Sequence, residues 1–160
     1  MAGLDRPSTS PGMTREEIEN AKMTTNTSPS ITRINPPELG TPPGYSQIVE
    51  VSANRTIFIA GQTALDRDGN LIGKNDFSTQ ATQVFRNLAI ALQASGCTAA
   101  NLVKLTVFLT DMGDLGLYRE ARNRFFASVT PPAAPAVTLV EVSKLYGPDF
   151  MIEIEAIAAV

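Results

Sequence analysis

The feature that most constrains the fold is one long amphipathic segment with strand-like runs on both sides of it. Apolar residues recur at spacings of three and four from Phe77 to Leu92, which predicts a helix. Gly96 follows closely, and glycine suits the left-handed conformation in which many helices end. A second helix is predicted from about Leu115 to Ser128. The β-rich run Leu102–Leu109 separates the two helices, so helices and strands must belong to one core.

The predicted strands are runs of β-branched, aliphatic and aromatic residues bounded by turn residues. They are Tyr45–Val51, Thr56–Ala60, Leu102–Leu109, Ala136–Val142 and Met151–Val160, with Ser30–Ile34 as a short edge-strand candidate. The first two are expected to form a hairpin through residues 52–55. The order β-β-α-β-α-β-β does not fit alternating βαβ winding. It predicts an α+β fold, in which the helices lie on one face of a mixed sheet.

The chain is expected to divide into an extension, residues 1–29, and one folded domain, residues 30–160. The extension is rich in Ser, Thr, Pro, Asn and charged residues, so it cannot bury enough apolar surface to fold. A short helix at 14–22 is possible within it. In the domain, helices on one face leave the other face of the sheet to be covered, and assembly is the usual way to cover it.

The composition excludes several kinds of chemistry. The chain has no histidine and one cysteine, Cys97, which removes Ser-His-Asp and Cys-His nucleophiles and any ordinary zinc site. A lone cysteine forms no internal disulfide, which fits a cytoplasmic location. The net charge of −3 disfavours nucleic-acid binding. No apolar run reaches the roughly 20 residues that a membrane helix needs. Catalysis would therefore use carboxylates, Arg, Lys, Tyr, hydroxyls, backbone groups and water.

Several motifs, each weak alone, together resemble the RidA/YjgF family of enamine/imine deaminases over roughly residues 32–160. They are Pro-Pro-Gly-Tyr-Ser-Gln (42–47), Ile-Ala-Gly-Gln (59–62), Gln80 through Asn87-Leu88, Leu-Val-Lys-Leu-Thr-Val-Phe-Leu-Thr-Asp (102–111), Pro-Ala (135–136), Val-Glu-Val (140–142) and Ile-Glu-Ile-Glu-Ala-Ile-Ala (152–158).

The resemblance implies a chorismate-mutase-like fold and a homotrimer around a sheet-lined barrel, with sites in clefts between subunits. The family's reaction is the hydrolysis of enamines and imines such as 2-iminopropanoate to a 2-oxo acid and ammonia, without a cofactor or metal. In the family an arginine pairs with the substrate carboxylate, and the site positions a water on the imine carbon.

The chain departs from the family at the position of that arginine, which Val137 occupies after Pro135-Ala136. A valine cannot hold a carboxylate, so the resemblance alone does not carry over the usual imino-acid substrates. Arg119 stands where family members often have Asn facing the cleft, and it could supply the missing cation from a different wall. The other interpretation is a solvated helix arginine paired with Glu120 or Asn123. Thr138 is the nearest remaining hydroxyl.

The other candidate site residues come from three parts of the chain. Glu153 lies in an apolar strand, where desolvation would raise its pKa and suit it to proton transfer; the alternative is an interfacial ion pair. Tyr45 matches the family tyrosine that borders the cleft, or it is only packed at a strand start. The substrate-binding candidates that complete the set are Ala60, Gly61, Gln62 and Tyr118, with Ala60 replacing a common family serine.

Four further residues receive structural interpretations. Cys97 is read as a small structural residue, because no base is near it in sequence. Lys104 is expected to be a sheet-edge or interface charge rather than a Schiff-base lysine. Arg122 and Arg124 are expected to lie on other helix faces than Arg119 and to be solvated.

The leading functional hypothesis is a cofactor-free hydrolytic deaminase, or a related hydrolase, acting on a small enamine, imine or amino-conjugated metabolite. Glu153 would shuttle the proton, Tyr45 would orient the substrate and Arg119 would anchor an anion. The alternative is a non-enzymatic trimer that binds a small neutral molecule or acts like a chaperone. The endoribonuclease activity often attached to the family name is opposed by the acidic pI of about 4.9 and the absence of histidine.

Overall fold

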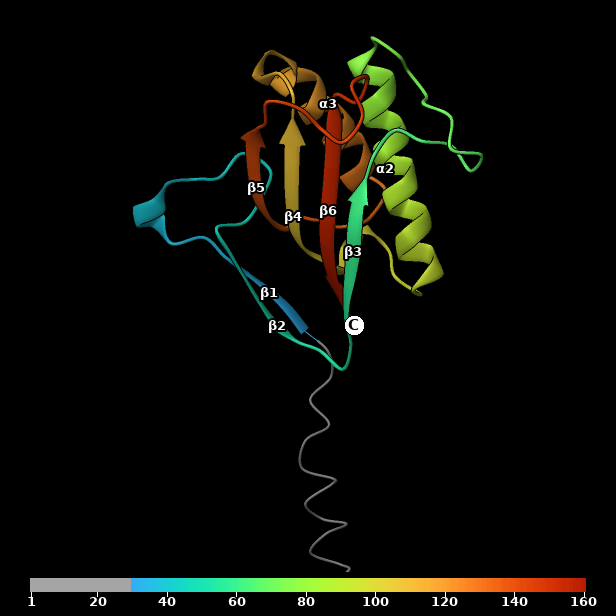
Figure 1. The fold of residues 1–160 in the computed structure, drawn as a ribbon. Coiled ribbons are helices and arrows are strands. Elements are labelled where there is room, and N and C mark those ends of the chain that lie inside the picture. Colours follow the sequence, from blue (N-terminus) through green and yellow to red (C-terminus); the bar gives the residue numbers. More distant parts are fainter. Residues whose placement is uncertain (1–29) are drawn as a thin grey trace, which may run out of the picture.

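The computed structural model describes residues 30–160 (Figure 1). The extension predicted over 1–29, with its candidate helix at 14–22, lies outside the described residues. The strands are β1 (Ser30–Ile34), β2 (Ile48–Ser52), β3 (Thr56–Gln62), β4 (Leu102–Leu109), β5 (Ala136–Glu141) and β6 (Ile152–Ala159). The helices are α2 (Phe77–Ala94) and α3 (Leu115–Phe126), with 3-10 turns at 37–39, 99–101 and 112–114.

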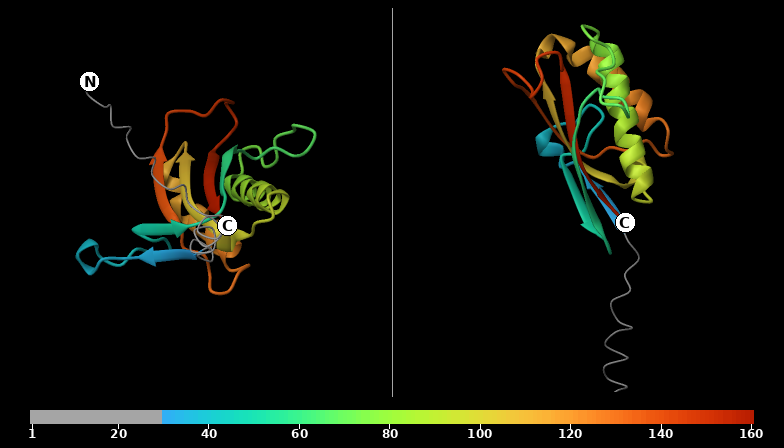
Figure 2. Two further views of the ribbon diagram at one scale, coloured as in Figure 1. Left: turned by 90° about the horizontal axis from the view of Figure 1, so that it is seen from below. Right: turned by 45° about the vertical axis from the view of Figure 1, so that its right-hand side comes forward.

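The core of the fold is a four-stranded mixed sheet in the order β3-β6-β4-β5. Strands β4 and β5 run parallel, and the β3–β6 and β6–β4 pairs are antiparallel. Both helices pack on one face of this sheet, as the turned view in Figure 2 shows. The predicted α+β class, with two helices on one face of a mixed sheet, is confirmed.

The sequence predicted a hairpin between the strands Tyr45–Val51 and Thr56–Ala60, and this prediction is wrong. Strand β2 pairs with β1 in a separate two-stranded sheet, and β3 pairs with β6. The reason lies in the connection: the backbone amides of Asn54 and Arg55 both donate to Val160 O at 2.8 Å. The segment between the strands is therefore tied to the end of β6, so β3 continues into the main sheet and β2 turns away.

The core forms between the helices and alternate residues of the central strands. On β6, Ile152, Ile154, Ala156 and Ala158 are buried. From α2, Leu88 and Leu92 are 0% and 1% exposed, and burial of each contributes about 1.5–3 kcal/mol. Helix α2 begins at Asp76, whose side chain accepts a hydrogen bond from Thr79 N at 3.1 Å. No helix within residues 30–160 is long and apolar enough to cross a membrane.

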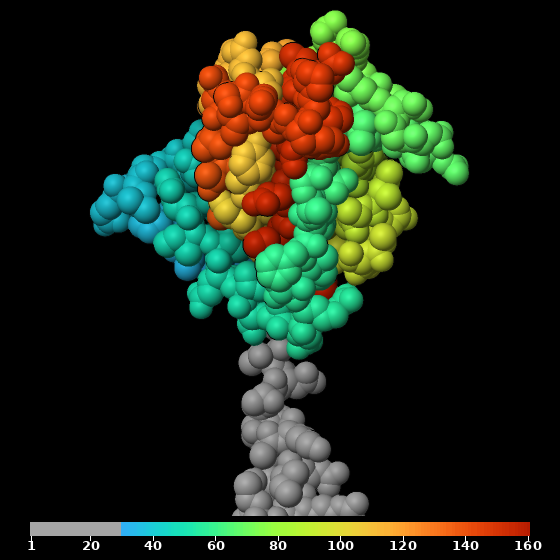
Figure 3. Space-filling view, in the orientation of Figure 1, coloured from blue at the N-terminus to red at the C-terminus, as the bar shows by residue number. Residues whose placement is uncertain are grey.

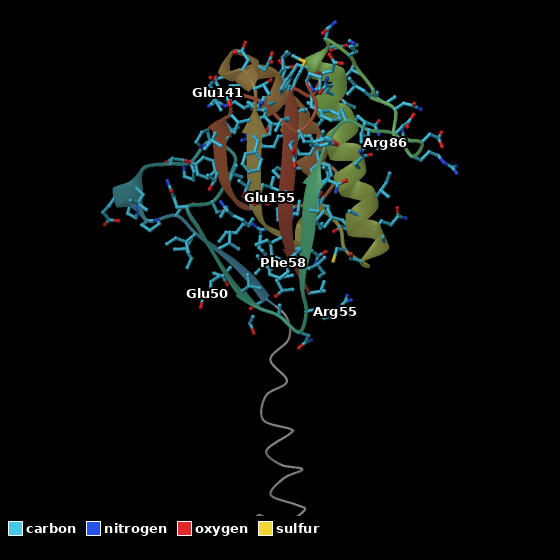
Figure 4. The ribbon with its side chains drawn as sticks, viewed as in Figure 1. Glu50, Arg55, Phe58, Arg86, Glu141 and Glu155 are labelled. Carbon is cyan, nitrogen blue, oxygen red and sulfur yellow. The ribbon has the colours of Figure 1, made fainter. Side chains whose placement is uncertain are left out.

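The opposite face of the sheet is here called the open face, because neither α2 nor α3, the two α-helices of residues 30–160, lies over it. Strand alternation places Phe58, Lys104, Thr106, Phe108, Thr138, Val140, Glu153, Glu155 and Ile157 there. Phe58 is 77% exposed. Figure 4 shows it beside Glu155 on the face turned to the viewer, and Figure 3 shows the same face hollowed over β4 and β6. A hollow of about 490 Å³ lies there, lined in part by Phe58, Lys104 and Glu155.

Candidate functional site

A pocket of about 250 Å³, here called the α3 pocket, lies where α3 meets the start of β5 and the 43–45 segment. Its lining comprises Pro43, Tyr45, Leu115, Tyr118, Arg119, Arg122, Val137 and Leu139. The 43–45 segment is held beside β5 by Ser46, whose backbone N donates to Pro135 O at 3.0 Å and whose hydroxyl donates to Ala134 O at 2.6 Å. This attachment brings Tyr45 next to Val137, residues far apart in the sequence.

Arg122 is buried in this pocket, and the prediction that it is solvated is wrong. It is 6% exposed. Its Nη2 donates to Pro43 O at 3.2 Å, and its Nε and Nη2 donate to Asn123 Oδ1 at 3.2 and 3.0 Å. The sequence contained a signal, because Arg122 stands four residues from each of the buried Tyr118 and Phe126 and so shares their helix face. The 43–45 segment, which crosses this face, supplies one polar partner, Pro43 O, and Asn123 of α3 itself supplies the other.

Tyr118 lies one turn before Arg122 and is 1% exposed. Its ring lies 6.2 Å from that of Phe85, and the Arg122 guanidinium carbon lies 5.9 Å from the Tyr118 ring centre. Its hydroxyl has no hydrogen-bond partner within the described part of the chain. Burial raises the pKa of Tyr118 to about 12, and the charge of Arg122 offsets part of that rise. The phenol therefore stays protonated and able to donate.

Arg119, the candidate for the cation that would replace the missing family arginine, also lines the α3 pocket. Neither partner considered for it holds it. Glu120 instead lies 4.0 Å from Arg124 Nη1, on an exposed part of α3, and Asn123 accepts from Arg122. Arg124 is solvated as predicted, with its side chain 58% exposed. The α3 pocket thus contains two guanidinium groups, and no carboxylate is among its lining residues.

Glu153 lies on the open face, with the β3 bulge at its side. Between the pairs Ile59–Ala156 and Gln62–Ile154, two residues of β3, Ala60 and Gly61, lie opposite the single residue Glu155 of β6, which is a bulge. A Cβ on Gly61 would collide with Glu153 Oε1, so only glycine leaves room for the carboxylate. Burial, and then repulsion from Glu155, raises the pKa of Glu153. This is the direction predicted from its apolar strand.

The remaining candidates also lie at the bulge or on the open face. Ala60 borders the open-face hollow, and Gln62 Nε2 donates to Ala60 O at 3.0 Å. Thr138 accepts a hydrogen bond from Lys104 Nζ. Lys104 is on β4, an inner strand, so it is a charge of the sheet face rather than of a sheet edge. Burial lowers its pKa, and Glu155 partly offsets this. Cys97 is buried, as expected of a structural residue.

The candidate residues therefore form two groups on opposite faces of the sheet. Tyr45, Tyr118, Arg119 and Val137 line the α3 pocket, and Ala60, Gly61, Thr138 and Glu153 lie at the bulge and the open face. One chain does not bring Glu153 into the α3 pocket. Within residues 30–160, no three Cys, Asp or Glu side chains gather where they could hold a metal ion.

Comparison with known proteins gives consistent results. The family model described as Endoribonuclease L-PSP matches residues 38–160. A RutC family protein of Synechocystis is 39% identical over 115 residues, covering 71% of this chain and 84% of that protein. The rat 2-iminobutanoate/2-iminopropanoate deaminase is 36% identical over 114 residues, covering 71% and 78%. The solved structure of the Rid family protein YyfB from Yersinia pestis superposes with a TM-score of 0.72 at 31% identity, covering 81% and 98%.

Proposed function

Because the chain belongs to the endoribonuclease L-PSP, or RidA/YjgF, family, we propose that it is a cofactor-free deaminase of a small enamine or imine. Water is the nucleophile, and the site is a cleft between copies of the chain in a homotrimer. The observation that carries this proposal is the division of the site: a cationic, apolar-walled pocket on one face and a carboxylate of raised pKa on the other. Relatives named as imine deaminases support the reaction class.

Glu153 is the group proposed to move the proton. Water adds to the imine carbon, a C–O bond forms, and the electron pair of the C=N bond moves to nitrogen. Protonated Glu153 delivers a proton to that nitrogen, and its carboxylate then takes one from the added water. Glu153, protonated again, gives its proton to the amine nitrogen and takes the remaining hydroxyl proton. The C–N bond then breaks as the C=O bond forms, giving a carbonyl product and ammonia. A raised pKa favours this exchange, because the carboxyl holds its proton more readily than an ordinary glutamate and can still release it.

The α3 pocket is proposed to bind and orient the substrate. Tyr45 places its ring or hydroxyl against the reacting group. Val137 and Leu139 supply apolar walls where the family pattern has a cation. Arg119 supplies a positive charge from α3 instead. Positioning suffices for much of the rate, because imine hydrolysis has a low barrier once water and imine are held together.

Assembly is proposed to bring the two groups of residues into one cleft. The open face carries apolar residues, with Phe58 77% and Val140 39% exposed, and a sheet face of this kind is normally covered. Packing of open faces around a closed symmetry axis would cover them. It would also present the Glu153 of one copy to the α3 pocket of the next.

The test is hydrolysis of 2-iminopropanoate, generated in situ by an amino-acid oxidase and trapped by semicarbazide. We expect the wild-type protein to suppress the trapped product and Glu153→Gln to abolish that suppression. Arg119→Gln should weaken it, whereas Arg124→Gln on the exposed face of the same helix should not. Activity in Val137→Arg but not in the wild type would show a site suited to a ligand other than imino acids. Inactivity of both would favour a non-enzymatic binding protein.

A further inference from the structure

Arg122 is a buried cation, and residues 30–160 supply no counter-ion for it. It is 6% exposed, and no carboxylate of the described chain lies within 4.0 Å of its guanidinium nitrogens. Its three hydrogen bonds go to a neutral carbonyl, Pro43 O, and a neutral amide, Asn123 Oδ1. Removing a charge from water is costly unless an opposite charge compensates it. The α3 pocket, which Arg122 lines, is the place where such a charge can be supplied.

The hydrogen bonds of Arg122 leave one side of the guanidinium group available. Its Nε and Nη2 are engaged, and Nη1 has no acceptor among residues 30–160. One helical turn away, the buried Tyr118 hydroxyl is likewise without a partner. The two groups border the same pocket. They offer two donor groups, the Nη1 amino group with its two N–H and the Tyr118 O–H, and the two oxygens of one carboxylate can accept from both groups at once.

We propose that Arg122 and Tyr118 form a carboxylate-binding subsite, so that the acid group of the ligand is held by α3 and not by residue 137 on β5. The inference rests on the proposed function in one respect, namely that the ligand is a small molecule in the α3 pocket. Arg119, which is exposed, then contributes charge at the outer part of the pocket. Val137 faces the uncharged part of the ligand.

The first arm of the test is binding without turnover. Butanoate and its neutral analogue butanamide differ in charge but little in shape, and neither carries an imine. Isothermal titration calorimetry of the full chain should show binding of butanoate and at least about tenfold weaker binding of butanamide. Equal affinities for the two probes, or no binding of butanoate, would overturn the subsite.

The second arm assigns the donors. Arg122→Gln and Tyr118→Phe should each weaken butanoate binding, by about tenfold or more for the charged group. Arg124→Gln is the matched control and should bind as the wild type does. Because Arg122→Gln also removes support from Pro43, Tyr118→Phe is the decisive variant: it deletes only a hydroxyl, which makes no hydrogen bond of normal length within residues 30–160. Unchanged butanoate affinity in Tyr118→Phe would refute its assignment as a ligand donor.

The remaining arms separate this inference from its competitors. If Arg122 is neutralised by a carboxylate of a second copy, Arg122→Gln will dissociate the assembly in sedimentation velocity and butanoate will not bind the wild type; that result overturns the subsite. Butanoate binding that depends on Tyr118, without imine hydrolysis, supports the subsite and removes only the proposed function. Imine hydrolysis with an unchanged KM in Tyr118→Phe keeps the function and removes the subsite.

Discussion

Burial separates three arginines of α3 that look alike in the sequence. Arg119 and Arg122 line the α3 pocket, and Arg124 is solvated beside Glu120. The candidate cation Arg119 was predictable from its alignment with a cleft position. The burial of Arg122 depends on the carbonyl of Pro43, 79 positions away, and helix periodicity alone does not reveal such a partner. The four-residue spacing between Tyr118 and Arg122 nevertheless places both side chains on one helix face, which indicates burial of Arg122.

Glu153 gives a prediction for pH at the same scale. Its pKa in the folded protein lies above the ordinary value of 4.5, so the folded state binds the proton more tightly than the unfolded chain. The corresponding stability is present below pH 4.5 and is lost as the pH rises through the raised value. Melting temperatures from pH 4 to 8 should fall less steeply for Glu153→Gln than for wild type. Glu120→Gln, on exposed α3, serves as control, and parallel curves for wild type and Glu153→Gln would contradict the shift.

The helices could be predicted from local sequence pattern. The strand pairing could not, because it depends on contacts between segments that are distant in the sequence. The helix predicted from the apolar spacing between Phe77 and Leu92 matches α2 closely, because that spacing is a local signal. The sequence located the strands within a few residues, but it did not predict which strand β2 pairs with. Its partner β1 and the attachment of Arg55 to Val160 depend on segments distant in sequence. The division of the candidate site residues between the two faces of the sheet could not be predicted for the same reason.

The segment before Tyr45 gives a prediction at the scale of an element. Gly44 has a φ of 81°, and a Cβ there would lie 2.5 Å from Arg122 Nη2. Gly40 has a φ of 73° and open space around it. Its ψ of 173° places it in a region that is open essentially to glycine alone, so Gly40→Ala should cost about 1–3 kcal/mol from backbone strain alone. Gly44→Ala should cost at least about 1 kcal/mol more, because it also displaces a buried side chain.

Urea unfolding at a fixed protein concentration measures both variants. Equal losses in Gly40→Ala and Gly44→Ala would show that Arg122 does not support the segment that carries Tyr45.

At the scale of the whole molecule, a single chain leaves apolar residues of the open face exposed. It places Phe58, 77% exposed, opposite Ile157 on the neighbouring strand. We predict that Phe58→Asp yields a species of single-chain mass, 17.1 kDa, in sedimentation velocity, because a charge there opposes burial of the face. Ile90, 56% exposed on the helical side, provides the control. Ile90→Asp should retain the wild-type mass, and an unchanged mass in Phe58→Asp would place any interface elsewhere.

The most direct test of the account is complementation between two inactive variants. Glu153→Gln lacks the proton carrier of the open face, and Tyr45→Phe combined with Arg119→Gln lacks the groups proposed for the α3 pocket. After subunit exchange in an equal mixture, a site built from two neighbouring copies is intact in about a quarter of the clefts. The account predicts recovery of about a quarter of the wild-type rate of 2-iminopropanoate hydrolysis. Recovery of none, with exchange verified by mass spectrometry, would contradict a site shared between copies.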